Sequence, residues 1–283
     1  MSRTIFNAYN DIKDELEGVT EDYVFEAKQI IKHITGYTNK EILLNYTQTL
    51  TEYQESRLAE ILDRRKTHYP LQYILEEWSF FGLPFLVGPG VLIPRQDTEA
   101  LVENALKRIK DKKAPRVLDL CTGTGCIAIA IAKERTDASV TAVEKFDEAL
   151  FFAEKNKELN RVPNMRILKG DVLTGAAKDM KYDLIVSNPP YITAEEMKNL
   201  QTEVTFEPAS ALFGGEDGLT YYRAIAKNYK DCLNAGGIIA FEIGEKQGAA
   251  VKKILEEAGF CNVETVTDIE DRQRVIFGTV HQI

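Results

Sequence analysis

The chain has 283 residues and is 44% hydrophobic, a composition typical of soluble globular proteins and a length sufficient for one large domain or two modest ones. No apolar run approaches the roughly 20 residues that a membrane span needs, which excludes an integral membrane protein. The formal net charge is −9. Nucleic-acid binders usually carry a basic surface, so duplex DNA or RNA is disfavoured as a partner.

The use of cysteine and histidine argues against a metal site. The four cysteines contain no Cys-x-x-Cys pair and the three histidines are scattered, so we expect no zinc site, no other metal and no disulfide framework. Free thiols are typical of a reducing cytoplasm. The first 16 residues are polar and acidic, unlike a secretory signal or a transit peptide, which predicts a cytoplasmic protein with no membrane partner.

Residues 1–73 have the apolar spacing of helices. The positions that recur at helical intervals are Ile5, Tyr9, Ile12, Tyr23, Ala27, Ile30, Ile31, Ile34, Leu58, Ile61 and Leu62. Gly36 is a natural end for the second of these helices, and either Thr49 or Thr51 can cap the third. Residues 40–46 are a further helical candidate. We therefore predict a small helical bundle that serves in packing or in partner recognition.

Residues 74–94 are rich in aromatic side chains that alternate with glycine and proline. This pattern predicts a β-hairpin that connects two domains. The loop that follows contains Arg95, placed where it can reach a carboxylate. Asp97 or Thr98 is then a candidate cap for an amphipathic helix that continues to Ile109.

A strand, a glycine-containing loop and a helix follow in succession. Residues 116–120 predict a buried strand, residues 121–125 read Cys-Thr-Gly-Thr-Gly, and residues 126–132 predict a helix rich in small side chains. Such a turn brings backbone N–H groups close to a ligand. The loop lacks the third glycine of a dinucleotide fingerprint and the lysine of a P-loop, so a pyrophosphate is not indicated as the ligand.

Acidic residues end the next two predicted strands. Glu144 follows the strand at 139–143, about 20 residues after the glycine loop, where a carboxylate can accept both hydroxyl hydrogens of a ribose. The alternative role for Glu144 is to cap the helix after it. Asp171 follows the strand at 165–169 and can accept a hydrogen bond from an adenine amino group, with Val172 against the ring. Otherwise Asp171 caps a short helix.

The sequence Ser-Asn-Pro-Pro-Tyr at 187–191 follows a fourth buried strand at 183–186. Ligands of open α/β sheets bind at this edge of the strands. Prolines donate no backbone hydrogen bond and restrict the chain, which leaves their carbonyl groups to accept. We therefore predict a clamp for a planar NH₂ group, in which Asn188 and a proline carbonyl accept its two N–H bonds and Tyr191 covers its face. An ordinary strand-to-loop turn is the alternative.

The remainder completes an α/β pattern. We expect a short helix at 194–200, a helix ending near Asn234, a turn at 235–237, a strand at 238–243 and a helix that stops at Gly259. Two strands then follow without a helix between them, so the last strand must insert antiparallel to its neighbours.

Six motifs in this chain resemble those of the protein-(glutamine-N5) methyltransferases that modify peptide chain release factors. They lie at residues 93–99, 118–125, 187–192, 206–208, 215–218 and 274–278. The resemblance implies an α/β fold, namely a seven-stranded Rossmann-like S-adenosylmethionine-dependent methyltransferase domain at 95–283. It also implies a small helical domain at 1–73 for recognition of the substrate protein, joined by the hairpin at 74–94.

The resemblance also implies roles for particular residues. Residues that would hold S-adenosylmethionine, which becomes S-adenosylhomocysteine, are Cys121, Thr122, Gly123, Thr124, Gly125, Glu144, Asp171, Val172 and Asn188. Residues that would hold or activate the substrate glutamine are Arg95, Asn188, Pro189, Pro190 and Tyr191. The chain departs from the family where Cys121 replaces the usual glycine and Glu144 replaces the common aspartate. These departures bear on how tight the loop is and on how far the carboxylate reaches.

The implied reaction is methylation of the glutamine in the Gly-Gly-Gln motif of class 1 release factors, which supports translation termination. We expect a monomer that binds no nucleic acid directly. Three alternatives stay open. The same NH₂ clamp suits the N6 amino group of adenine in DNA or RNA, although such an enzyme must flip its base and bind phosphate. A glutamine in a ribosomal protein is a second possible substrate, and a non-enzymatic binding module is the third alternative.

Overall fold

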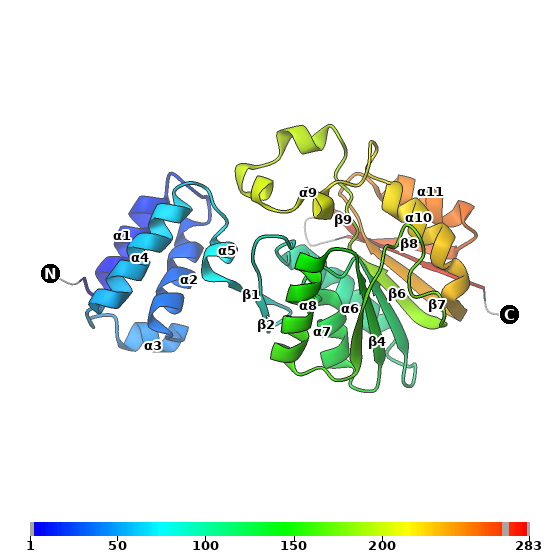
Figure 1. Ribbon diagram of the computed structural model, residues 1–283, viewed down its shortest axis with the longest axis horizontal. Coiled ribbons are helices and arrows are strands. Elements are labelled where there is room, and N and C mark those ends of the chain that lie inside the picture. Colours follow the sequence, from blue (N-terminus) through cyan, green and yellow to red (C-terminus); the bar gives the residue numbers. More distant parts are fainter. Residues whose placement is uncertain (1–2, 268–271, 282–283) are drawn as a thin grey trace. The chain divides into compact units, whose positions relative to one another are not determined.

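A computed structural model describes residues 3–267 and 272–281 of the chain, which folds into two compact units (Figure 1). The first unit contains Met1–Glu76 and the separate segment Gln201–Phe206, and the second contains Glu77–Leu200 and Glu207–Ile283. Across the described residues, no helix is both long enough and apolar enough to cross a membrane.

The first unit is helical. Its helices are α1 (Ile5–Leu16), α2 (Tyr23–Thr35), α3 (Asn39–Leu44), α4 (Glu52–Arg65), α5 (Leu71–Leu75) and the 3-10 turn η3 (Thr202–Phe206). Apolar side chains of α1, α2, α4 and α5 share one buried core. Gly36 ends α2 in the left-handed conformation, as predicted. Thr51 rather than Thr49 caps α4, because its side chain and that of Gln54 bond each other's backbone N–H groups.

A buried ion-pair cluster holds the segment 201–206 in this unit. The guanidinium of Arg65 is fully buried and donates to both carboxylate oxygens of Glu26, over 2.7 and 2.8 Å. It also pairs with Glu203 at 2.5 Å. The ring of Phe206 packs edge-on against Tyr69, with 5.1 Å between the ring centroids. Because a buried guanidinium needs partners, these contacts specify where the segment lies.

The second unit is built on a seven-stranded sheet in the order β5-β4-β3-β6-β7-β9-β8 (Figure 1). The strands are β3 (Arg116–Leu120), β4 (Ser139–Glu144), β5 (Met165–Lys169), β6 (Tyr182–Ser187), β7 (Leu233–Glu242), β8 (Cys261–Thr267) and β9 (Gln273–Thr279). The first five strands in the order are parallel, and β9 lies antiparallel between β7 and β8. This topology confirms the predicted fold class and the antiparallel last strand.

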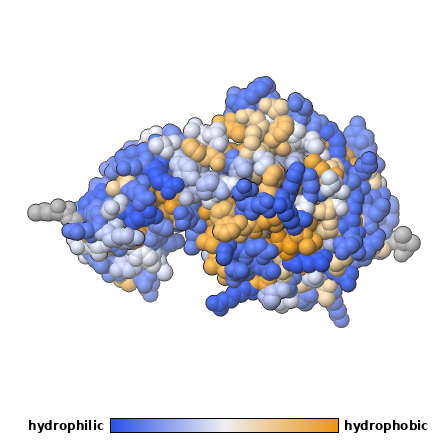
Figure 2. Space-filling model, viewed as in Figure 1, coloured by the Kyte–Doolittle hydropathy of each residue, from blue (hydrophilic) through white to orange (hydrophobic). Residues whose placement is uncertain are grey.

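Helices cover both faces of the sheet, as the continuously apolar strands require. The helices and turns of this unit are η1 (Gln96–Thr98), α6 (Glu99–Arg108), α7 (Cys126–Glu134), α8 (Asp147–Asn160), η2 (Glu196–Asn199), α9 (Ala209–Leu212), α10 (Thr220–Tyr229), η4 (Lys230–Cys232) and α11 (Gly248–Glu257). α6 and α7 pack on one face, and α10 and α11 on the other. Figure 2 shows apolar residues on the visible surface near α8, where Phe151 and Leu159 are exposed.

Three predicted elements differ from the structure. The strands of the hairpin are short, β1 (Glu77–Phe80) and β2 (Leu83–Leu86), and residues 87–94 form turns and extended loop. The predicted turn at 235–237 lies inside β7, and α10 ends earlier than expected, at Tyr229. Gly236 has φ +67°, and the pairing of β6 with β7 shifts register nearby. The glycines therefore form an irregularity within a strand rather than a turn before it.

Candidate active site

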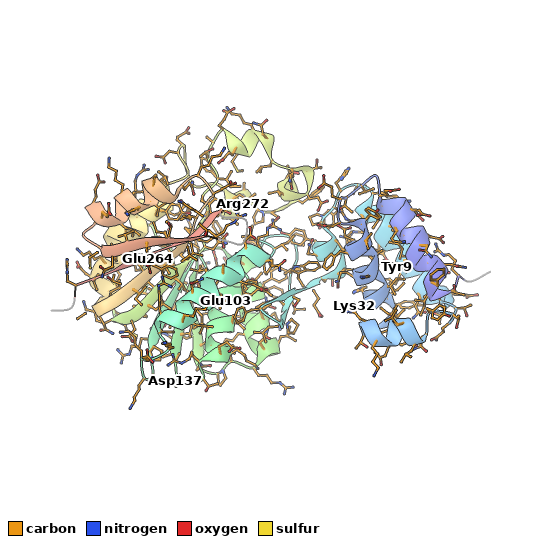
Figure 3. All side chains as sticks on the ribbon, turned by 180° about the vertical axis from the view of Figure 1, so that it is seen from behind. Tyr9, Lys32, Glu103, Asp137, Glu264 and Arg272 are labelled. Atoms are coloured by element: carbon orange, nitrogen blue, oxygen red, sulfur yellow. The ribbon has the colours of Figure 1, made fainter. Side chains whose placement is uncertain are left out.

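The carboxyl ends of β3, β4, β5 and β6 meet at one edge of the sheet and line a cleft. Parallel pairing sets Leu120 beside both Val143 and Ser187, so the residues that follow these strands converge. Asp137, labelled in Figure 3, precedes β4 and marks the opposite edge. The cleft encloses about 610 Å³, including its open mouth, and the predicted site residues that line it are Cys121, Gly123, Glu144, Asp171, Val172, Asn188 and Pro190.

The other predicted residues lie around this cleft without lining it. The side chains of Thr122 and Thr124 are buried in the loop. Thr122 donates its hydroxyl hydrogen to Asp119, and the Thr124 carbonyl accepts a 3.0 Å bond from Asn156. Gly125 is the N-cap residue of α7 and has φ +81°. These three residues therefore hold the conformation of the glycine loop from its buried side.

Asp119 at the end of β3 supports the same loop from inside. Its carboxyl group is fully buried, and its Oδ2 atom accepts from the hydroxyl of Thr122. Burial raises the pKa of the Asp119 carboxyl to about 7, against the opposing effect of the Thr122 bond. This side chain therefore ties the end of β3 to the glycine loop.

Cys121 occupies a backbone conformation that favours glycine. Its φ is +60°, in the left-handed region, which explains why a glycine is the usual residue at this position of the motif. Burial raises the pKa of the Cys121 thiol well above its ordinary value. The thiol is therefore protonated at neutral pH and lines the cleft as a small neutral group.

The strain at Cys121 leads to a prediction about stability. Cys121→Gly should change the free energy of unfolding by less than about 1 kcal/mol, because relief of the backbone offsets the larger entropy of unfolded glycine. Cys121→Val should destabilise by about 1–3 kcal/mol, because β-branched residues rarely tolerate positive φ. Denaturant unfolding measures both. Equal losses in the two variants would contradict a backbone origin.

Glu144 is buried at the end of β4 and organises three backbone N–H groups. One carboxylate oxygen, Oε1, accepts from Lys145 and Phe146 over 2.7 and 3.1 Å. Within residues 3–267 and 272–281, the other oxygen, Oε2, accepts one bond, from Gly123 over 2.9 Å. Because a carboxylate oxygen has about two acceptor positions, Oε2 is the atom with room for a ligand hydroxyl. The N-cap position of α8 belongs to Phe146, so the alternative role of Glu144 as helix cap is wrong.

Asp171 and Val172 close the cleft at the end of β5. Asp171 accepts from the N–H of Leu173 over 2.8 Å and pairs with Lys145 at 2.9 Å. Burial raises the pKa of the Asp171 carboxyl, but the Lys145 and Leu173 bonds outweigh burial and leave that pKa lowered. Residues 171–181, all described, form turns and the approach to β6 without a helix, so the alternative of a helix cap is wrong.

The Asn188–Tyr191 segment is held from several sides. Its Tyr191 carbonyl accepts a 2.9 Å bond from Gln247, and Ile192 pairs with Phe213 in an isolated bridge. Gly214 lies so close that an added Cβ would come within 2.7 Å of the Pro190 carbonyl oxygen and the Tyr191 Cα atom. Burial raises the pKa of the Tyr191 phenol, which stays neutral. These contacts fix the conformation of the segment, unlike that of an ordinary strand-to-loop turn.

Arg95 does reach a carboxylate, but that carboxylate belongs to the chain itself. Arg95 pairs with Glu207, whose other oxygen accepts a 3.0 Å bond from the N–H of Ile93. Arg95 therefore ties the loop at 93–98 to the segment before α9. Arg95 is not among the residues that line the cleft.

Asn188 contacts two residues that the sequence analysis did not assign to the site, Thr98 and Glu242. Thr98, predicted as a helix cap, makes no cap bond in the described structure; it instead accepts a 3.2 Å bond from Asn188 Nδ2 and donates to Glu242 over 2.5 Å. Asp97, the other predicted cap, pairs with Arg274 at 3.1 Å. The sequence offered one signal for Glu242, because this acidic residue interrupts an otherwise apolar run at 238–243.

Comparison with known proteins places this arrangement in a class. Residues 96–236 match the methyltransferase small domain. A methyltransferase from Pyrococcus furiosus is similar in structure, with TM-score 0.53 and 19% identity over 82% of this chain and all of that one, which shows the shared fold. Together with the curated relatives described next, the matched domain makes the protein a methyltransferase.

The sequence comparisons narrow the class to a family. Residues 7–75 match the PrmC N-terminal domain. Two similar proteins are release factor glutamine methyltransferases, one from Thermodesulfovibrio yellowstonii at 38% identity over 93% of this chain and 96% of that one, and one from Salmonella typhimurium at 40% over 89% and 91%. The chain belongs to the release factor glutamine methyltransferase family, which confirms the resemblance inferred from its motifs.

Proposed function

We propose that this enzyme transfers a methyl group from S-adenosylmethionine to the side-chain N5 of the glutamine in the Gly-Gly-Gln motif of class 1 release factors, and so supports translation termination. The observation that carries the proposal is family membership over about nine-tenths of the chain, both domains included. The Asn188 side chain at the cleft supports it. We further propose that the protein acts in the cytoplasm as a monomer, without nucleic acid.

The cleft has the donors and acceptors that S-adenosylmethionine requires. Glu144 Oε2, which accepts from Gly123, would accept a ribose hydroxyl at its second acceptor position, and Asp171 and Val172 would frame the adenine. The glycine loop, with φ +56° at Gly123, lets backbone approach the methionine end closely. When bound, the cofactor supplies an electrophilic methyl group on a positively charged sulfur.

The residues of the Asn188 segment would prepare the glutamine for transfer. An amide nitrogen is a poor nucleophile because its lone pair is delocalised into the carbonyl group. Asn188 Oδ1 and the Pro189 carbonyl would accept its two N–H bonds, which raises electron density on nitrogen and orients it toward the methyl group. Tyr191 would cover the amide and exclude water. Orientation of this kind contributes several kcal/mol to lowering a barrier, by order of magnitude.

The decisive experiment is mass spectrometry of a purified release factor after incubation with enzyme and S-adenosylmethionine. We expect one added methyl group, on the glutamine of the Gly-Gly-Gln peptide, and none in a reaction without cofactor. Parallel reactions contain duplex DNA and ribosomal proteins. Methyl transfer to adenine or to a ribosomal protein, with none to the release factor, would refute the proposal.

The helical unit is proposed as the part that recognises the release factor. Side chains of α1, α2 and α3 line an apolar groove, formed by Ile5, Phe6, Tyr9, Lys28, Ile31, Asn39, Ile42, Leu43 and Tyr46. Tyr9 on α1 is labelled in Figure 3. Leu43, which lines the groove, is 74% exposed, and its chain neighbour Leu44 is 71% exposed. Exposed apolar residues that gather in this way commonly mark a protein-binding surface.

Leu43→Glu should therefore impair use of the protein substrate. We expect kcat/KM for the intact release factor to fall about tenfold, the loss typical of a contributing interface residue. Transfer to a short Gly-Gly-Gln peptide and affinity for S-adenosylmethionine should stay unchanged. The matched control is Leu159→Glu, which makes the same change at an exposed apolar position of α8. Equal losses in both variants, or no loss in Leu43→Glu, would exclude this role of the groove.

A further inference from the structure

Three side chains from distant parts of the second unit form a hydrogen-bonded chain behind the cleft. Asn188 follows β6, Glu242 ends the neighbouring strand β7, and Thr98 ends η1. Asn188 Nδ2 donates to Thr98 Oγ1 over 3.2 Å, and Thr98 Oγ1 donates to Glu242 Oε2 over 2.5 Å. Thr98 and Glu242 are both buried, with 2% and 4% exposure. They do not line the cleft as described.

The direction of these hydrogen bonds follows from the chemistry of the groups. An ionised carboxylate only accepts, so the Thr98 hydroxyl must donate its single hydrogen to Glu242. The lone pairs of that hydroxyl then accept, and only the NH₂ end of the Asn188 amide can supply the hydrogen. The amide of an asparagine can otherwise turn over, because its oxygen and nitrogen are nearly equal in size. With the nitrogen held by Thr98, Oδ1 is the atom left for the cleft.

We propose that Thr98 and Glu242 are positioning residues that fix the Asn188 amide with its oxygen available to the substrate NH₂ group. The proposal rests on the proposed role of Asn188 as acceptor. A reversed amide would present its own NH₂ group to the substrate NH₂, two donors that cannot bond each other. The positioning residues thus determine that the site accepts a donor group, as the glutamine amide requires.

The charge on Glu242 is part of this arrangement. Burial raises the pKa of the Glu242 carboxyl to about 7, against the lowering effects of the Thr98 bond, of Arg274 and of a hydrogen bond from the Asn188 side chain. Other ionisable groups that act on Glu242 or lie against it come from η1, α7, the loop after β6, and α10: they are Asp97, Cys126, Tyr191 and Tyr222. A protonated Glu242 donates to Thr98, which frees the hydroxyl hydrogen to meet the oxygen of a reversed Asn188 amide.

The test compares Thr98→Val, which keeps the shape and removes the hydroxyl, with Thr98→Ser, which keeps the hydroxyl. We expect Thr98→Val to lower kcat on release factor by about tenfold or more with KM for S-adenosylmethionine within about twofold, whereas Thr98→Ser stays within about threefold of wild type. Calorimetric S-adenosylmethionine binding and thermal unfolding establish that each variant is folded. Wild-type activity in Thr98→Val, or equal losses of kcat in the two variants, would overturn the proposal.

A second readout concerns the Glu242 charge directly. The kcat of the wild type should fall as pH is lowered through about 7, and Glu242→Gln, which has no group to titrate, should lack that fall. Identical pH profiles of kcat in wild type and Glu242→Gln would contradict a role for the Glu242 charge. Asn188→Ala separates this inference from the proposed function. If that variant is inactive and Thr98→Val is fully active, positioning fails while the function stands; if Asn188→Ala is itself fully active, the acceptor role fails.

Discussion

Replacing Asn188 with alanine should lower kcat for release factor methylation by about 100-fold or more, and change affinity for S-adenosylmethionine by no more than about threefold. The reason is that the amide oxygen of Asn188 is proposed to hold and orient the reacting nitrogen. An alanine leaves that nitrogen solvated and free to rotate. Asn188 does line the cleft, so a small effect on cofactor affinity is expected as well.

Single-turnover kinetics with radiolabelled S-adenosylmethionine, together with calorimetric titration of the cofactor, measure both quantities. The matched control is Asn199→Ala, the same change at an exposed position of η2. It should behave as wild type. If Asn188→Ala loses cofactor affinity and kcat in equal proportion, Asn188 serves mainly the cofactor and the clamp is wrong.

Replacing Glu144 with alanine should weaken S-adenosylmethionine binding by about 30- to 100-fold, the cost of losing hydrogen bonds to a charged acceptor. Glu144 also fixes the N–H groups of Gly123, Lys145 and Phe146, so the loop and the start of α8 lose their common anchor. Glu144→Asp keeps the carboxylate and has the residue common at this position in the family. We expect that variant to bind within about fivefold of wild type.

Isothermal titration calorimetry with S-adenosylmethionine tests this pair, and Glu154→Ala on the exposed face of α8 is the control. The free energy of unfolding without cofactor is measured in parallel. Loss of the loop anchor should lower it, whereas loss of ribose contacts alone should leave it unchanged. Unchanged cofactor affinity in Glu144→Ala would remove the ribose role.

Much of this fold is encoded locally and was predictable. The spacing of apolar residues identified the helices of the first unit, and Gly36 and Thr51 marked helix ends because caps act within a few residues. The glycine loop between a strand and a helix, and acids or Asn188 directly after strands, placed the cleft. Since the carboxyl ends of parallel strands meet at one edge, chain order alone predicted that these residues converge.

Other features depend on pairings between residues far apart in the chain. Asn188 and Thr98 are separated by 90 positions, and Thr98 and Glu242 by 144. Sequence patterns favour local roles for both residues, Thr98 as a helix cap and Glu242 as a residue within a strand. Because η1 packs against the ends of β6 and β7, the Thr98 hydroxyl bonds to Asn188 and Glu242 instead of capping α6.

The segment 201–206 and the two prolines illustrate the same division. Nothing near Glu203 in the sequence indicates that it joins the helical unit, because its partner Arg65 lies 138 residues away. Asn-Pro-Pro-Tyr, by contrast, predicts a stiff acceptor-rich loop from its own backbone chemistry. The sequence by itself determined which groups stand at the edge of the sheet, since strand periodicity and proline geometry are local. The tertiary structure decided which way the Asn188 amide faces, since that orientation depends on buried partners that long-range packing alone brings into contact.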